Sequence, residues 1–171
     1  DWRPSQSALD YAAAAKPLLE GAGKLIMQSD WVPSPGGIHY SQASIRAAAA
    51  AKRSAAFARS RASWLTIIED LGLQALFLSY EQIERGDLTP DRVRVMILPE
   101  SEAISAKEAQ RIRAFVKAGG TVIADVRTAL RDKHCRLLPK GQLDDLFGLK
   151  RGAPGKERPP RTIRLINAAG V

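Results

Sequence analysis

The chain has 171 residues, of which 45% are hydrophobic, and a formal net charge of +8 from 26 Lys and Arg against 18 Asp and Glu. This length supports one domain with a sizeable core, and no stretch is apolar for long enough to cross a bilayer. The basic segments lack interleaved aromatic residues and match no nucleic-acid-binding module, so we expect neither a membrane nor a nucleic-acid partner. A single cysteine permits no internal disulfide and does not indicate a compartment.

The first 36 residues are predicted to form a helix and a linker. Alanine-rich sequence from Ser7 to Met27 favours a helix, and Pro17 predicts a break within it. The Pro- and Gly-rich segment 31–37 indicates a loop. The chain begins without an initiator methionine or a signal-peptide pattern and ends abruptly, so we interpret it as a domain excised from a longer protein.

Four short apolar runs are predicted to be strands, near residues 37–40, 74–79, 93–98 and 121–126. The alanine-rich segment 45–56 and the segment 57–71 are predicted to be helices, either separate or continuous. In the second of these helices, four apolar residues are expected to share one face: Trp64, Ile67, Ile68 and Leu71.

The clearest unit is the strand, helix and strand between Val93 and Arg127. Ser105 and Glu108 have the spacing of a capping box, which predicts a helix start, and the pair Gly119–Gly120 predicts its end. Two apolar strands joined by one helix indicate a right-handed parallel crossover. We expect five apolar side chains of this unit to be buried together: Ile97, Phe115, Val116, Val122 and Ile123.

Strands that alternate with helices predict a three-layer α/β/α fold with a mostly parallel, flavodoxin-like sheet. Residues 37–149 are expected to form this α/β core, with a short helix at 142–147. Residues 150–171 are expected to form a C-terminal loop with an edge strand at 162–166. The whole chain is therefore interpreted as a single domain.

In a parallel sheet, ligands bind beyond the carboxyl ends of the strands. The polar residues at those ends form the predicted ligand crevice: Ser41, Gln42, Ser44, Tyr80, Glu100, Asp125 and Arg127. Ser41 and Ser44 are more simply interpreted as caps of the following helix. Glu100 and Asp125 both lie near strand ends, where a catalytic carboxylate pair would be placed, but a solvated loop position is the better interpretation of Glu100.

Other chemistries find little support in the residues. No Gly-x-Gly-x-x-Gly sequence is present to hold a dinucleotide, and the few His and Cys residues do not have the spacing of a metal site. Cys135 lacks the flanking glycines and following helix of a nucleophile elbow, so we expect no glutamine hydrolysis. His39, inside a strand, is predicted to be a packed or hydrogen-bonded histidine. We therefore predict no catalytic residue, cofactor or metal.

The central unit resembles a known family. His39-Tyr40-Ser41-Gln42-Ala43-Ser44, the strand Val95–Pro99 and above all the segment Ala114–Ile123 are similar to the glutamine-amidotransferase-like domain that follows the catalytic barrel in family-42 β-galactosidases, called the trimerisation domain. The similarity covers about residues 37–149. It implies a flavodoxin-like sheet without an amidotransferase triad, and a supporting or oligomerising role beside a sugar-cleaving barrel.

Two function classes follow. The first is a non-catalytic structural or oligomerisation domain of a larger glycoside-hydrolase-like protein, which associates with itself or with the rest of its chain. The alternative is an amidotransferase-fold enzyme, or a domain that binds a small ligand such as a carbohydrate in the strand-end crevice.

Overall fold

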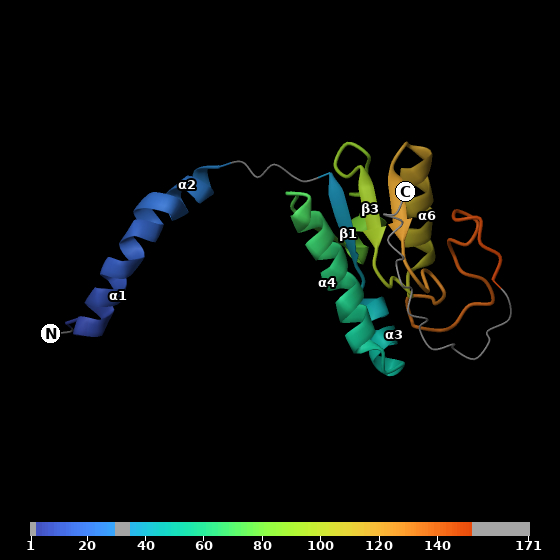
Figure 1. The fold of residues 1–171 in the computed structure, drawn as a ribbon, viewed down its shortest axis with the longest axis horizontal. Coiled ribbons are helices and arrows are strands. Elements are labelled where there is room, and N and C mark those ends of the chain that lie inside the picture. Colours follow the sequence, from blue (N-terminus) through green and yellow to red (C-terminus); the bar gives the residue numbers. More distant parts are fainter. Residues whose placement is uncertain (1–2, 30–34, 152–171) are drawn as a thin grey trace, which may run out of the picture.

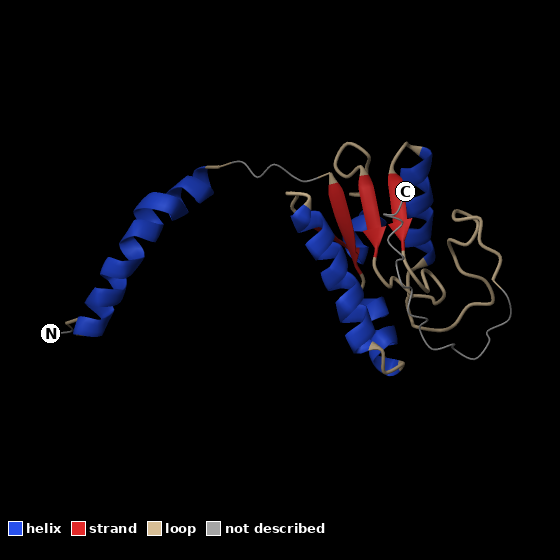
Figure 2. Ribbon diagram, viewed as in Figure 1, coloured by secondary structure: helices blue, strands red, loops and turns tan. Residues whose placement is uncertain are grey.

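The computed structural model describes residues 3–29 and 35–151. The core contains four parallel strands, β1 (Gly36–Tyr40), β2 (Leu76–Ser79), β3 (Val95–Leu98) and β4 (Thr121–Ala124), in the order β2-β1-β3-β4. Helices cover both faces of this sheet, which makes the predicted three-layer α/β/α fold (Figure 2). The expected edge strand at 162–166 lies outside the described residues. No described helix combines the length and apolar character that crossing a membrane would require.

The two faces of the sheet pack against different helices. One face lies under α4 (Ser54–Asp70), which follows α3 (Gln42–Ala50) after a short break. The other face packs against α5 (Tyr80–Arg85) and α6 (Ala106–Lys117), where Phe115 and Ile112 meet Leu78 and Met96. The cluster of buried side chains on the α5–α6 face is larger than the cluster under α4, so most of the hydrophobic core lies on the α5–α6 side.

The predicted core set is wrong as a single cluster. Ile97 packs with Ile38 and Ile68 under α4, whereas Phe115 lies in the core on the opposite face. Ile123 is 38% exposed. The cause is the two-residue period of a strand, because neighbours such as Val122 and Ile123 must point to opposite faces.

Helix α6 shows why its sequence ends in two glycines. Gly119 has a φ of +98°, and the Gly119 and Gly120 amides donate to the carbonyls of Val116 and Phe115, which is a Schellman motif. A Cβ on Gly120 would lie 2.2 Å from the ring of Phe115. The first glycine therefore supplies a left-handed conformation, and the second leaves room for the aromatic ring.

The N-terminal helical segment consists of α1 (Gln6–Pro17), a π-helical turn (Leu18–Ala22) and α2 (Gly23–Gln28). The predicted break occurs just after Pro17, and Gly21 has a non-helical backbone there. These helices contain no buried residue and extend away from the sheet (Figure 1).

The chain after β4 is irregular, as expected near residues 131–135. The short helix predicted at 142–147 is not formed, because this segment consists of turns. Buried Asp144 organises them, since its carboxylate accepts hydrogen bonds from the Gly141 amide and from Arg151. A carboxylate that binds its own backbone favours a turn over a continuing helix.

Candidate functional site

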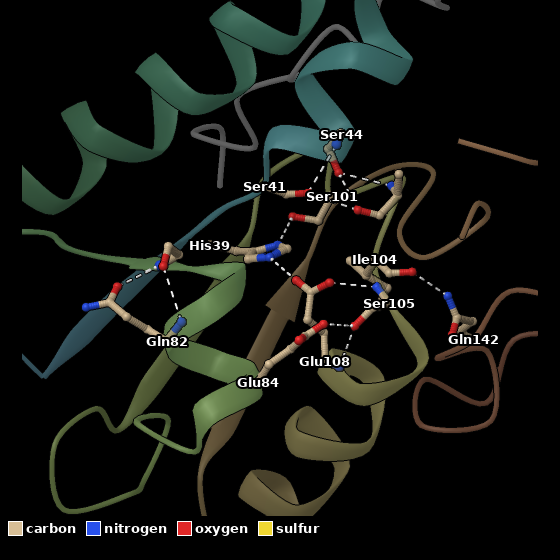
Figure 3. Close-up of polar contacts among 12 residues, drawn as sticks. His39, Ser41, Ser44, Gln82, Glu84, Ser101, Ile104, Ser105, Glu108 and Gln142 are labelled. Atoms are coloured by element: carbon tan, nitrogen blue, oxygen red, sulfur yellow. Dashed lines mark hydrogen bonds and ion pairs between the residues drawn. The ribbon is translucent and has the colours of Figure 1, made fainter. Parts of the chain in front are cut away.

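The two serines of the predicted crevice have structural roles at the start of α3. Ser41 is the N-cap of α3, and its hydroxyl accepts from the Ser44 amide at 3.1 Å. Both hydroxyls donate to the carbonyl of Ala103, and Ser44 Oγ also accepts from the Ala103 amide (Figure 3). The capping interpretation is confirmed for Ser41 and is wrong for Ser44, which lies inside α3. Both serines attach α3 to the loop that follows β3.

Gln42 and Tyr80 make only local contacts at the rim. The Gln42 side-chain amide donates to the Tyr40 hydroxyl at 3.0 Å, and the Tyr80 hydroxyl donates to Glu81. The hydrogen bond to Glu81, and then the negative charge of Glu81, raise the pKa of Tyr80 above its usual value. Glu81 therefore favours the protonated form of Tyr80.

Glu100 lies at a sharp turn directly after β3, with a φ of +41°. Such a conformation is strained for a residue with a Cβ. The Asp125 carboxylate accepts a 2.6 Å hydrogen bond from the Glu100 amide and also accepts from Ser60 of α4. The turn resembles the elbow on which α/β hydrolases place a nucleophile, but here a glutamate occupies it and Asp125 fixes it.

Glu100 also belongs to a buried network of ion pairs with Glu102 and three arginines. Arg53 Nη1 lies 3.2 Å from Glu100, and its other terminal nitrogen binds Glu102. Arg127 binds Glu100 at 3.0 Å, and Arg131 binds Glu102 at 2.7 Å. Each carboxylate thus lies between two guanidinium groups.

Both carboxylates of this network are almost fully buried, at 6% and 4% exposed for the side chains of Glu100 and Glu102. Burial by itself raises the pKa of Glu102, but hydrogen bonds from Arg53 and Arg131 outweigh it and hold the pKa below its usual value. Two of the predicted crevice residues, Glu100 and Arg127, are therefore committed to internal pairing.

His39 is the centre of a second buried network, shown in Figure 3. Its Nε2 lies 2.9 Å from Glu108, and its Nδ1 lies 2.9 Å from the Ser101 hydroxyl. Glu108 also closes the predicted capping box of α6, where its carboxylate accepts from the Ser105 amide at 2.6 Å. The prediction of a hydrogen-bonded histidine is confirmed.

Serine, histidine and glutamate in contact resemble a hydrolytic triad. Access argues against that chemistry, because Ser101 is 1% exposed, His39 3% and Glu108 2%. A nucleophile must reach a substrate carbonyl, and this hydroxyl lies inside the protein. The arrangement therefore holds β1, α6 and the loop after β3 together.

Cys135 contacts helix α3, which its sequence context did not suggest. The irregular loop turns back so that the Cys135 thiol donates to the carbonyl of Ala43 in the first turn of α3, at 3.3 Å. The residue has a φ of +65°. Both ring nitrogens of His39 are engaged with Ser101 and Glu108, so this histidine is not free to act as a base for the thiol.

A pocket of about 280 Å³ opens beside these networks. Ser41 and Tyr80 of the predicted crevice line it, together with Arg46, Lys133 and His134 among others. Glu100, Asp125 and Arg127 do not. Of the seven predicted residues, Ser41 and Tyr80 thus line the pocket and Glu100 and Arg127 belong to the ion-pair network, whereas the other three belong to neither.

Sequence reasoning missed Arg53, Glu102 and the second role of Glu108. Arg53 lies in an alanine-rich basic segment, where an arginine is normally solvated. The available signal was the pair of glutamates directly after a buried strand, since two buried carboxylates require cations from elsewhere in the chain.

This geometry defines a three-layer α/β/α domain with a parallel sheet, with buried ion pairs beyond two of its strand ends. Residues 39–154 match the family model described as the β-galactosidase trimerisation domain. The chain belongs to this family of glycoside hydrolase family-42 trimerisation domains. Among curated proteins, none matches the chain.

Two solved structures share the fold. One is the β-galactosidase from Bifidobacterium adolescentis, with a TM-score of 0.58 and 23% identity over 69% of this chain and 54% of that one. The other is the polyextremophilic β-galactosidase from the Antarctic haloarchaeon Halorubrum lacusprofundi, with a TM-score of 0.58 and 20% identity over 70% of this chain and 18% of that one. The chain thus spans about half of the first protein and less than a fifth of the second.

The description of the family as a trimerisation domain implies self-association or contact with other chains. The expected contact with the rest of its own chain stays a prediction.

Proposed function

We propose that this chain is the non-catalytic, self-associating domain of a larger glycoside hydrolase that cleaves β-galactosides. The observation that carries the proposal is that the polar residues at and just beyond the ends of β1 and β3 are paired with other residues of the chain. Where a catalytic α/β domain presents a nucleophile and a base, Glu100 and Glu102 are neutralised by arginines, and His39 is held between two partners. The family match supports the same role.

Two measurements test this proposal. The full-length protein is expected to hydrolyse a chromogenic β-galactoside and to form an oligomer in light scattering. The 171-residue chain alone is expected to show no hydrolysis. Glu100→Gln in the full-length protein should lower thermal stability without changing turnover per folded molecule. Hydrolysis by the isolated chain, or a turnover defect that exceeds the folding defect, would contradict the proposal.

A second candidate function has one specific observation in its favour, the pocket beside Ser41 and Tyr80. Its hydroxyl, carboxylate and cationic lining can donate and accept hydrogen bonds, which suits a polyhydroxylated ligand such as a monosaccharide. Calorimetry with galactose is expected to show binding that Tyr80→Ala weakens and that Leu149→Ala, an exposed control, leaves unchanged. Equal heats from wild type and Tyr80→Ala would remove this candidate.

The amidotransferase alternative is tested by a glutaminase assay. We expect no turnover, since Cys135 donates to a backbone carbonyl and His39 is engaged elsewhere. Turnover in the wild type that disappears in Cys135→Ser would restore an enzymatic function.

A further inference from the structure

The sheet face under α4 carries one row of four apolar side chains. Register pairs place Phe77 beside Ile38, Ile38 beside Ile97, and Ile97 beside Ile123, so the row crosses the whole sheet. The two central residues are buried beneath α4, where Ile68 packs on them. The two outer residues remain open, with Phe77 42% and Ile123 38% exposed. A single helix therefore covers the middle of this face and leaves both ends of the row uncovered.

The open end at β2 continues into the end of α4. Ile67 and Leu71, which were expected on the same helical face as Trp64, are 48% and 69% exposed, and Leu73 is 38% exposed. These three residues and Phe77 are exposed apolar residues between the last turns of α4 and the edge strand β2, and we call them the β2-edge patch (Ile67, Leu71, Leu73 and Phe77). The opposite end of the row is the β4-edge patch (Ile123 and Val126, the latter 56% exposed).

Exposed charges of opposite sign lie where the chain approaches the two edge strands. Glu69 and Asp70 are exposed in the last turn of α4, next to the β2-edge patch. Lys117 is exposed at the end of α6, a few residues before β4. Arg94 is also exposed, and its backbone carbonyl accepts a hydrogen bond from the amide of Thr121, the first residue of β4. None of these four side chains has an ion-pair partner within the part of the chain that the structure describes.

The acidic residues are also placed where their own helix does not stabilise them. The carboxyl end of a helix carries partial negative charge and favours cations, whereas α4 ends with Glu69 and Asp70. Cations from another molecule would offset this repulsion. Figure 1 shows that the ends of α4 and α6 lie on opposite sides of the sheet, so Lys117 of the same chain does not supply that charge.

A three-fold ring needs two different surfaces. In a closed cyclic trimer each subunit contacts its neighbours head to tail, so one surface meets a second, non-identical surface. The two patches have these properties, since both are apolar, they lie on opposite edges of one sheet, and their charged borders are complementary. Resting on the self-association in the proposed function, we infer that the β2-edge patch of one copy binds the β4-edge patch of the next copy.

Substitutions on each patch test the inference in the full-length protein. Leu71→Lys places a cation opposite the partner's basic border, in a position that the end of a helix favours. Ile123→Glu places an anion opposite the acidic border. Each is expected to weaken association at least about 100-fold, as for a central interface residue, and to reduce the mass in sedimentation velocity from trimer to monomer. Leu137→Lys, at a 55% exposed site away from both patches, is the control that stays trimeric.

Mixing the two defective proteins distinguishes head-to-tail from symmetric contact. The intact β2-edge patch of Ile123→Glu can still bind the intact β4-edge patch of Leu71→Lys, so the mixture should give a heterodimer and no trimer. Because Ile123→Glu changes a strand, Lys117→Glu provides a surface variant, and combining it with Asp70→Lys in one chain should restore the trimer.

The outcomes separate the two proposals. A monomeric wild type would overturn the proposed self-association and this inference together. A trimeric wild type whose patch variants all remain trimeric would overturn the inference alone. Dissociation of only one patch variant would likewise overturn the pairing of the two edges.

Discussion

Removal of the Arg53 guanidinium is the sharpest test of the ion-pair network. Arg53 contacts both Glu100 and Glu102, whose side chains are 6% and 4% exposed. Loss of one partner from a buried pair usually costs about 3–5 kcal/mol, because it leaves an uncompensated charge. Each glutamate here keeps a second arginine, Arg127 or Arg131. We therefore expect Arg53→Met to lower the free energy of unfolding by about 2–3 kcal/mol, below that full range.

The effect should also depend on pH. Arg53 and Arg131 hold the pKa of Glu102 below its ordinary value of 4.5. A depressed folded-state pKa stabilises the protein above the unfolded-state value, and this contribution is lost as pH falls through the folded-state pKa. The gap between wild type and Arg53→Met should thus be full at neutral pH, begin to shrink below about pH 4.5, and close once the pH falls through the lower pKa of Glu102 in the wild type.

Urea unfolding followed by circular dichroism at several pH values measures both effects. Arg59→Met is the matched control, because Arg59 is an exposed residue of the same helix, and it should change stability by less than about 0.5 kcal/mol. A loss below about 1 kcal/mol in Arg53→Met, or a gap that does not change with pH, would refute the reasoning.

Three further substitutions probe the core and the caps, each measured by urea unfolding. Phe115→Ala should cost about 3–5 kcal/mol, the range for truncating a buried aromatic, and a loss under about 1 kcal/mol would place Phe115 outside the core. Gly120→Ala should cost about 1–3 kcal/mol through overpacking against that ring, and a neutral effect would show that the ring moves freely. Glu108→Gln should cost about 1–3 kcal/mol, since it perturbs the contacts to His39 and the Ser105 amide. An unchanged midpoint would show that those contacts contribute little.

Local rules were enough to predict the layers of the fold. The strands, the capping box at Ser105 and the ending at Gly119–Gly120 follow from short-range chemistry that the sequence carries directly. The prediction of a single core cluster was wrong, because periodicity shows that strand side chains alternate between two faces but not which helix covers each face. The apolar face predicted for α4 is also only partly buried, since Ile67 and Leu71 are exposed. A helix packed on a sheet buries a narrower stripe of its surface than its apolar pattern suggests.

The candidate site was less predictable because its chemistry depends on pairs that are distant in sequence. The contact between Arg53 and Glu102 joins residues 49 positions apart, and that between His39 and Glu108 joins residues 69 apart. Nothing in a local pattern distinguishes a solvated arginine from one that enters a buried network. The Glu100 elbow was similarly hidden, since its positive φ is maintained by Asp125 from another strand end.

The strained elbow at Glu100 and the ion pairs of Glu100 and Glu102 both make this end of the sheet rigid. Holding Glu100 at a positive φ costs about 1–3 kcal/mol, which a catalytic domain recovers as reactivity. Here the strain turns a carboxylate toward Arg53 and Arg127, which connect the loop after β3 to α4 and to the segment after β4. The carboxyl edge of the sheet is thereby fixed to α4, the helix that covers the two central residues of the row, Ile38 and Ile97. Rigidity of that helix and sheet is what an interface built from the two sheet edges requires, because a preorganised surface loses less entropy on association.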